Sequence, residues 1–174
     1  VSGGELSAPV VSESDPKVYT ATFTPAAGSE TTASISVGSG TYFDAAGNAG
    51  VGATGPTLSI DTQAPGLLIT SDVDTLKAGE AATVTFTFSD VPTGFSAGDI
   101  AVSGGELSAP VVSESDPKVY TATFTPAAGS ETTASISVGS GTYFDAAGNA
   151  GVGATGPTLS IDTQAPSLLI TSDV

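Results

Sequence analysis

The chain contains two asparagines, Asn48 and Asn149, and each follows an aspartate by four residues within a repeated stretch, TYFDAAGNAG. In the second copy the pair is Asp145 and Asn149, and Gly148 between them permits a tight turn. Carboxylate and amide oxygens are the donors that Ca²⁺ prefers, about six to eight of them at roughly 2.3 to 2.6 Å. Each DAAGN stretch is therefore a candidate source of calcium ligands.

The same stretch has a second interpretation as an ordinary turn. Asp, Asn and Gly are favoured in turns because Asx side chains bond their own backbone and tolerate left-handed conformations. The net charge of −15 creates a self-repulsion that a divalent ion would relieve, but acidity also promotes solubility without any site. Spacing alone leaves both interpretations open.

The elements that must position these residues are β-strands, because apolar residues alternate with polar ones at period two and no helical period is present. About seven strands in some 100 residues, separated by turn signals, predict an all-β, immunoglobulin-like antiparallel β-sandwich, with a small barrel as the alternative. The clearest alternating stretches are 83–88, 119–124 and 134–138, followed by the pairs Ile100 with Val102 and Leu159 with Ile161.

The chain is a tandem repeat, because residues 1–73 recur as 102–174 with one difference, Gly66 against Ser167. The period, 102 − 1 = 101 residues, is longer than the roughly 20 to 50 residues of a solenoid unit, so it indicates self-contained domains. We predict the C-terminal part of a repeat at 1–61, a complete repeat at 62–162, and a linker with the next first strand at 163–174. Since half a sandwich cannot bury a core, we expect residues 1–61 to be completed by a neighbouring chain or to come from a longer one.

The predicted topology gathers acidic residues at the two ends of the complete domain. In a seven-stranded sandwich the chain enters at one end, here called a pole. The second strand ends at this pole, and the loop between the sixth and seventh strands lies there too. The preceding linker arrives at that same pole. The predicted ligands at this joint are Asp61, Asp90, Asp145 and Asn149, and a second candidate group at the opposite pole comprises Asp72, Asp74 and Glu80.

Composition excludes several classes of function. Without Cys, His or Arg the chain lacks disulfides and the usual nucleophiles, bases and oxyanion clamps, and we expect no enzyme. A glycosidase uses two carboxylates at a defined separation as acid and base, and Glu106 and Glu114 match that pair only in residue type. Three lysines against 18 carboxylates argue against nucleic acid and anionic membranes. No apolar run approaches the roughly 18 residues of a membrane span, so we expect no membrane insertion, with any export signal outside this segment.

Two recognition functions are alternatives to a purely structural one. A Ca²⁺-dependent glycan-binding module is the main rival, although the only aromatic residues besides Phe are Tyr19, Tyr42, Tyr120 and Tyr143. Rows of Thr at 83–87 and 121–125 suit flat recognition surfaces such as ice. However, β-propensity alone places Thr on the wet face of a strand.

The chain resembles the bacterial Ig-like repeats in the extender regions of giant RTX adhesins. The resemblance lies in six stretches taken in order: DTQAP, LLITSD, TLKAGEAATVTFTFSD, GFSAGDIAVSGGELS, DPKVYTATFTP and TYFDAAGNAG. It implies type I secretion to the bacterial cell surface, folding outside the cell, and a Ca²⁺-stiffened spacer for adhesion and biofilm formation. The implied partners are neighbouring identical repeats, and the adhesin's own ligand is bound outside this segment.

The resemblance also implies a set of calcium positions. Asp61 would act with Asp90, Asp145 and Asn149 at one joint. Related repeats often have Glu where this chain has Asp90, and the shorter Asp90 side chain would place its oxygens farther from such an ion. The corresponding residues of the flanking joints are Asp44, Asn48 and Asp162.

Overall fold

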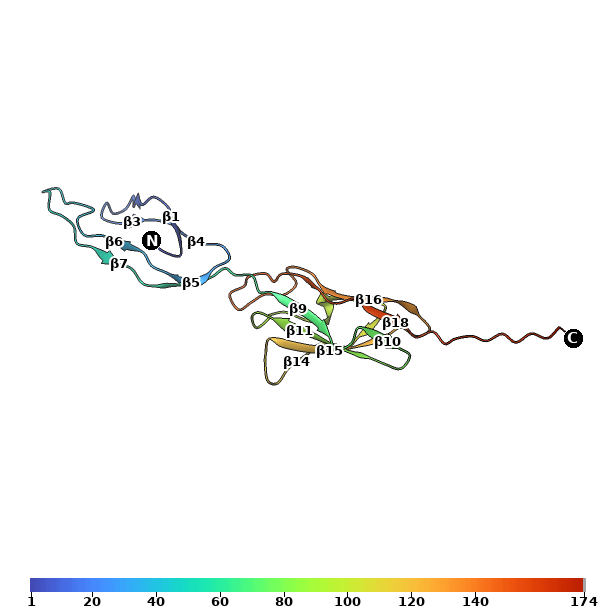
Figure 1. Ribbon diagram of the computed structural model, residues 1–174. Coiled ribbons are helices and arrows are strands. Elements are labelled where there is room, and N and C mark those ends of the chain that lie inside the picture. The colour runs from blue at the N-terminus through green and yellow to red at the C-terminus, as the bar shows by residue number, and fades with distance from the viewer. Residues whose placement is uncertain (174) are drawn as a thin grey trace. The chain divides into compact units, whose positions relative to one another are not determined.

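The computed structural model describes residues 1–173 and divides into two compact units, Val1–Gln63 and Ala64–Val174, here called unit 1 and unit 2. The described residues contain β-strands, one 3₁₀ turn, η1 (Ala97–Asp99), and no α-helix. Figure 1 shows both units, each built mainly from antiparallel strands.

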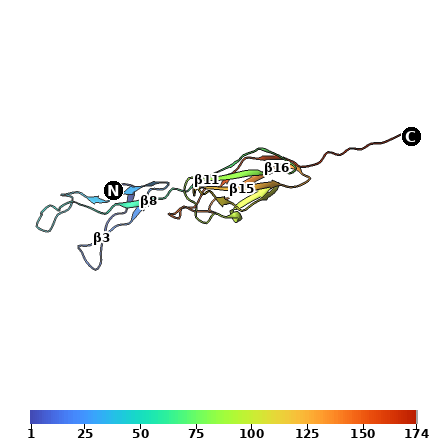
Figure 2. The same cartoon turned by 90° about the horizontal axis from the view of Figure 1, so that it is seen from below.

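Unit 2 consists of two five-stranded sheets that pack face to face (Figures 1 and 2). All neighbouring strands are antiparallel except β10 and β18, which run parallel along one edge. One sheet has the order β13 (Gly105–Leu107), β15 (Val119–Pro126), β11 (Ala82–Phe88), β9 (Leu67–Ser71), with β14 (Val111–Val112) beside β15. The other has the order β10 (Thr75–Lys77), β18 (Leu159–Asp162), β16 (Glu131–Val138), β12 (Ile100–Ser103), with β17 (Ala154–Thr155) beside β16.

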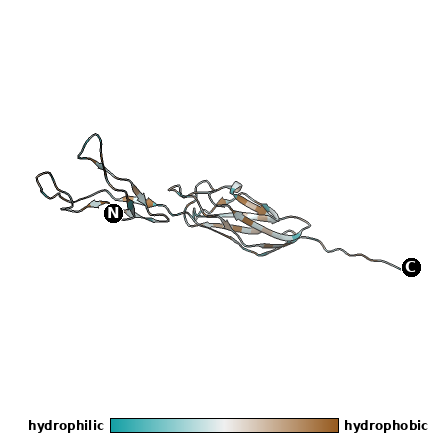
Figure 3. Cartoon of the chain, turned by 90° about the horizontal axis from the view of Figure 1, so that it is seen from above, coloured by the Kyte–Doolittle hydropathy of each residue, from teal (hydrophilic) through white to brown (hydrophobic). Residues whose placement is uncertain are grey.

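The core of unit 2 lies between these sheets and follows the period-two pattern. In β11, Val84, Phe86 and Phe88 are buried, whereas Thr83 and Thr87 are exposed. The same alternation holds in β15 and β16, so apolar side chains line the inner faces. Figure 3 colours the apolar residues of the cartoon brown. The predicted all-β sandwich is confirmed, and two separate sheets exclude the barrel.

The ten strands of unit 2 correspond to about seven runs of chain, because several runs are interrupted. The first run leaves one sheet as β9 and joins the other as β10, and the chain changes sheets again between β12 and β13. The breaks between β13 and β14 and between β17 and β18 stay within one sheet, since each pair lies beside the same strand, β15 or β16. Such splitting at sheet edges is typical of sandwiches, where bends let one run serve both sheets.

Unit 1 has the sequence of the later part of unit 2 but little core. Its short strands form four separate two-stranded ladders, and its buried apolar residues are Ala33 and Ile60. The ladders pair β1 (Gly4–Leu6) with β4 (Phe23–Pro25), β2 (Val10–Val11) with β3 (Tyr19–Thr20), β5 (Glu30–Ala33) with β8 (Leu58–Asp61), and β6 (Ser36–Val37) with β7 (Ala53–Thr54).

Beyond β18 the chain runs away from the sheets as a single extended trace (Figure 1). Residues 163–173 form no strand ladder, and Leu168, Leu169 and Ile170 are exposed. The expectation that 163–174 holds a linker and a first strand stays a prediction, and its last residue lies outside the described part of the chain.

Candidate metal centre

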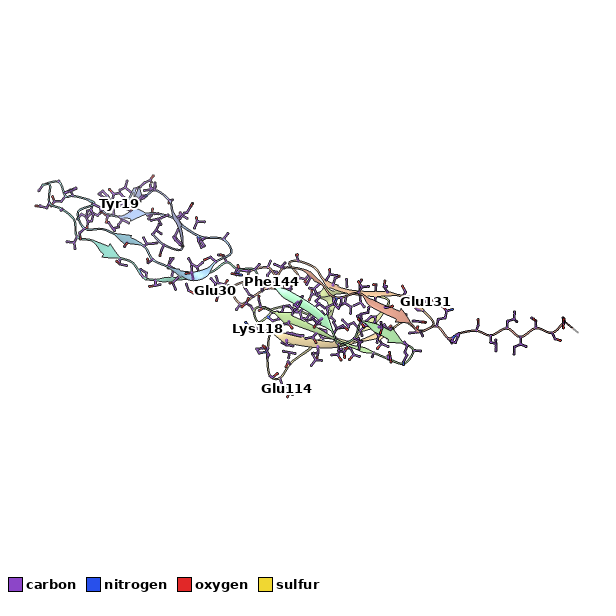
Figure 4. The ribbon with its side chains drawn as sticks, in the orientation of Figure 1. Tyr19, Glu30, Glu114, Lys118, Glu131 and Phe144 are labelled. Carbon is purple, nitrogen blue, oxygen red and sulfur yellow. The ribbon has the colours of Figure 1, made fainter. Side chains whose placement is uncertain are left out.

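The DAAGN loop of unit 2 lies beside the loop that follows β11. Thr93 donates its amide to the Phe144 carbonyl at 2.7 Å, and the Phe144 amide donates to the Thr93 carbonyl at 3.0 Å. Phe144 is labelled at this end of unit 2 in Figure 4, together with Lys118. Within unit 2 the structure therefore brings together the loops of Asp90 and Asp145.

Tyr143 anchors the DAAGN loop to the start of unit 2. Its side chain is fully buried, and its hydroxyl lies 3.0 Å from the Pro65 carbonyl and 2.7 Å from that of Val152. Its ring meets Phe88 edge-on, with centroids 4.9 Å apart. Burial raises the pKa of the Tyr143 phenol because the interior disfavours the charged phenolate. Sequence reasoning missed this anchor, although a tyrosine two residues before Asp145 in both copies was a visible signal.

Close packing beneath this tyrosine depends on a glycine. A β-carbon at Gly151 would lie 2.2 Å from the Tyr143 ring, well inside van der Waals contact. The Gly151 amide also donates to the Tyr143 carbonyl at 2.8 Å. The repeated Gly after DAAGN therefore makes room for the aromatic anchor.

Asp145 and Asn149 form a hydrogen-bonded turn. The Asn149 amide donates to Asp145 Oδ1 at 2.8 Å, and Asn149 Nδ2 donates to Asp145 Oδ2 at 2.8 Å. Gly148 between them has φ +90°, the left-handed conformation that favours glycine. Asn149 thus presents its NH₂ group to the carboxylate, which is the geometry of the turn interpretation and accounts for both residue types.

The Asp145 carboxylate is buried yet favours the charged form. Its residue is 6% exposed. Burial raises the pKa of this carboxyl. Hydrogen bonds from the side chain and amide of Asn149, and from the amides of Ala147 and Gly148, lower the pKa by more than burial raises it, so the pKa of Asp145 lies below its usual value. The loop therefore holds a fixed negative charge at neutral pH.

Asp90, the second carboxylate at this pole, already has a cation nearby. Lys118 Nζ lies 3.9 Å from Asp90 Oδ1, and Ser89 Oγ donates to Asp90 Oδ2 at 2.8 Å. Lys118 Nζ also donates to the Ser89 carbonyl. Sequence reasoning gave Lys118 no role, and it is the residue with which a metal ion at Asp90 would compete.

The remaining predicted joint ligands lie in other settings. Asp61 belongs to unit 1, where its Oδ1 accepts the Gln63 amide at 3.1 Å, so its meeting with Asp145 stays a prediction. Asp162 accepts the Gln164 amide at 3.2 Å and stands in register with Glu131 on one side and Lys77 on the other.

The first DAAGN copy repeats the turn in unit 1. The amide and Nδ2 of Asn48 both donate to the Asp44 carboxylate at 2.8 Å. The Asn48 side chain contributes most to lowering the pKa of Asp44, followed by the Asn48 amide. Here, however, Asp44 is exposed.

The acidic residues of the opposite pole serve separate local roles. Asp72 Oδ1 accepts the Thr83 amide at 2.8 Å, and the Asp74 carbonyl accepts the Ser160 amide at 2.8 Å. Glu80 pairs with Lys77 at 3.4 Å, and the Lys77 amide is the main cause that lowers the pKa of Glu80. Across residues 1–173 the structure places no three His, Cys, Asp or Glu side chains together where they could hold a metal ion.

Other predicted features can be placed as well. Glu114 lies at the tip of the loop that follows β14 and points away from the sheets (Figure 4), whereas Glu106 lies in β13. The described residues include no helix that is long and apolar enough to span a membrane.

Comparison with known proteins gives one match. A family model described as a bacterial Ig-like domain matches residues 1–59 and again residues 61–161. Neither the curated proteins nor the solved structures gave a significant match.

Proposed function

The chain belongs to the bacterial Ig-like domain family, and from that membership we propose that it is a non-catalytic spacer of an adhesin on the bacterial cell surface. In this role, tandem domains project a distal ligand-binding region for adhesion and biofilm formation. Type I secretion to the outside of the cell is part of the proposal. Bacterial Ig-like domains are generally non-catalytic modules.

The observation that carries this proposal is the repetition itself. Residues 1–73 and 102–174 differ at one position, so successive domains present the same surface. Identical surfaces make uniform links but do not diversify recognition. A folded domain of about 100 residues has a radius of gyration near 13 Å, so each link would add roughly 30 to 40 Å of reach.

The packing of unit 2 supports a link better than a sugar-binding platform. Tyr143 is fully buried, and Tyr120 packs against the core between Phe88 and Phe95. Both tyrosines of the complete domain are therefore used for internal packing. No observation on the described residues favours the glycan-binding alternative.

Calcium at the DAAGN pole is the finer part of the proposal. Its support is the fixed charge of Asp145, which the Asn149 turn holds in place. Asp145, Asp90 and Asn149 are the residues of unit 2 that would hold the ion, with Asp61 from the preceding linker. Within unit 2 the fit is partial, because Asp90 lies beside Lys118 and the Asp145 carboxylate already accepts hydrogen bonds. An ion bound here would stiffen the joint, and extracellular modules typically bind Ca²⁺ at about 10⁻⁴ to 10⁻³ M.

The test is small-angle scattering of polypeptides with two, three and four complete repeats, in calcium and in chelator. A spacer predicts a maximum dimension that grows by roughly 30 to 40 Å per repeat. A calcium joint predicts that chelation shortens this dimension and lowers the melting temperature of the same polypeptides in a parallel thermal unfolding experiment. Asp145→Asn should remove both responses. A dimension that stops growing with repeat number would refute the spacer. Linear growth that is indifferent to calcium would refute the calcium joint alone.

A further inference from the structure

Within unit 2, the chain enters at one end and leaves at the other (Figure 1). The entering run contains β9 and then β10, and β18 is the last strand before the chain leaves. At the entrance the Pro65 carbonyl accepts the Val152 amide at 3.0 Å and lies 3.0 Å from the Tyr143 hydroxyl. At the exit Thr163 donates its amide to the Ser130 carbonyl at 2.8 Å. A pull along the chain therefore reaches unit 2 through its first run and through β18.

The strands β10 and β18 are hydrogen-bonded neighbours that run parallel. Their ladder has three register pairs, here called rungs: Thr75 with Ser160, Leu76 with Ile161, and Lys77 with Asp162. Beside them, the Ser160 amide donates to the Asp74 carbonyl at 2.8 Å. Because the strands are parallel, a pull on the N-terminal side of β10 and on the C-terminal side of β18 drags them in opposite directions along one axis. The bonds of a parallel ladder are evenly spaced along the strands, so the rungs are strained together in shear.

The middle rung of this ladder lies in the core. Leu76 is 3% exposed and Ile161 is 1% exposed. Sliding these strands would break hydrogen bonds in an apolar surrounding and expose both side chains to water. The β9 part of the same run is anchored to the other sheet, because Ile69 is buried and β9 pairs with β11 through five residues. The first run therefore cannot slide without losing contacts in both sheets.

We propose that the parallel pair of β10 and β18 is a mechanical clamp that keeps unit 2 folded under tension along the chain. This proposal rests on the proposed spacer function, because a spacer that joins a cell to a distal attachment transmits the force on that attachment. The clamp consists of backbone and side chains of unit 2 alone, so it holds with or without a bound ion. Its strength depends on direction: pulled apart from the same end, the two strands would separate one rung at a time.

The test is single-molecule force spectroscopy of the full 174-residue chain in chelator. Because the sequence contains no cysteine, two introduced cysteines define the points where force is applied. Gln63→Cys with Thr171→Cys pulls the clamp in shear, whereas Ala78→Cys with Thr171→Cys pulls β10 and β18 from the same end and peels them. All three positions are exposed. At one pulling speed, shear should need at least about twice the unfolding force of peeling, because the three rungs break together instead of in turn.

A matched pair of core variants separates the clamp from overall stability. Leu76→Ala removes a buried side chain from the clamp. Ile136→Ala removes one of the same 3% exposure from β16, where that strand pairs with β12. At a fixed shear force, Leu76→Ala should unfold at least about tenfold faster than wild type. Ile136→Ala should stay within about threefold of wild type, because its contacts are still intact when the clamp breaks and forced unfolding follows the unfolding rate.

Controls and contrary outcomes are specific to the clamp. Urea unfolding followed by circular dichroism checks that both variants fold and lose similar equilibrium stability, and the comparison of pulling directions needs no core substitution. Equal unfolding forces in the two directions, or equal acceleration by Leu76→Ala and Ile136→Ala, would overturn the clamp. Either result would leave the spacer standing, because that function is tested by growth of the maximum dimension with repeat number. A failure of that growth would refute the spacer without changing the forces measured on unit 2.

Discussion

Residues 1–61 and 102–162 have the same sequence but differ in what covers them. Tyr143 is fully buried in unit 2, whereas its counterpart Tyr42 is 52% exposed. Val138 is 3% exposed, and its counterpart Val37 is 50% exposed. Unit 2 additionally contains residues 64–101, which supply β9, β10, β11 and the first half of β12. The comparison shows that burial of this sequence depends on those strands and not on the sequence itself.

The DAAGN turn and the strand pairings, in contrast, recur in both units. The Asp and Asn of DAAGN make the same 2.8 Å hydrogen bonds in each copy. The ladder of β5 with β8 has the register of the ladder of β16 with β18. The turn and the strand pairings therefore occur both with and without a core, whereas the strands of unit 1 are shorter and their side chains are less buried.

The largest expected effect comes from removing the aromatic anchor. Tyr143→Ala should destabilise unit 2 by about 3 to 5 kcal/mol, because it deletes a fully buried ring and leaves a cavity. The matched variant Tyr42→Ala should cost less than about 1 kcal/mol, because that ring is largely in water. Urea unfolding of the full chain, followed by circular dichroism, measures both. Equal losses would show that unit 1 has a core like that of unit 2.

A smaller effect is expected from filling the space under that ring. Gly151→Ala should cost about 1 to 3 kcal/mol, because the added methyl overlaps a ring that is fixed on all sides. Gly50→Ala brings its β-carbon equally near Tyr42, but this exposed ring is free to move aside. Thermal unfolding of the two variants tests the difference, and a tolerated Gly151→Ala would mean that the Tyr143 pocket is loose.

Removing one hydroxyl should have a still smaller effect. Tyr143→Phe loses the hydrogen bonds to Pro65 and Val152, which should cost about 0.5 to 1.5 kcal/mol, and Tyr42→Phe should be nearly neutral. Because burial raises the pKa of Tyr143 above the unfolded value of about 10, its contribution is complete below that pH and is lost as pH rises through the folded pKa. Tyr143→Phe should therefore reduce the alkaline loss of stability, measured by urea unfolding from neutral to alkaline pH. An unchanged alkaline profile would contradict this role.

The smallest effect is confined to acid. The pKa of Asp145 is lower in the folded state, so its contribution is present above the unfolded pKa of about 3.9 and is lost as pH falls through the folded value. Asp145→Asn should make the unfolding free energy of unit 2 less dependent on pH below about 4. Asp44→Asn is the control, because that residue is exposed in unit 1, and it should leave the main transition unchanged. If both variants changed the acid profile equally, burial would not be what distinguishes the two turns.

Much of the fold was predictable from the pattern of side chains. Alternation at 83–88, 119–124 and 134–138 predicted β11, β15 and β16 and their buried faces, because a strand points successive side chains to opposite sides. The placement of Asp90 near the DAAGN loop followed from strand order. The pairing of Asp90 with Lys118 did not, because Lys118 comes from the loop before β15 and its approach depends on tertiary packing.

By itself, the sequence determined the repeat, the strands, and the turn in which Asn149 holds Asp145, since these depend on residues that are near in the chain. Only the tertiary structure decided which copy of that turn is buried. Tyr143 is covered because Pro65 and Phe88 pack against it. Asp145 lies in the loop that Phe144 joins to Thr93 after β11, and unit 1 contains no counterpart of these partners. Burial is a property of what long-range packing brings together, and two identical stretches of sequence therefore have different surroundings in one chain.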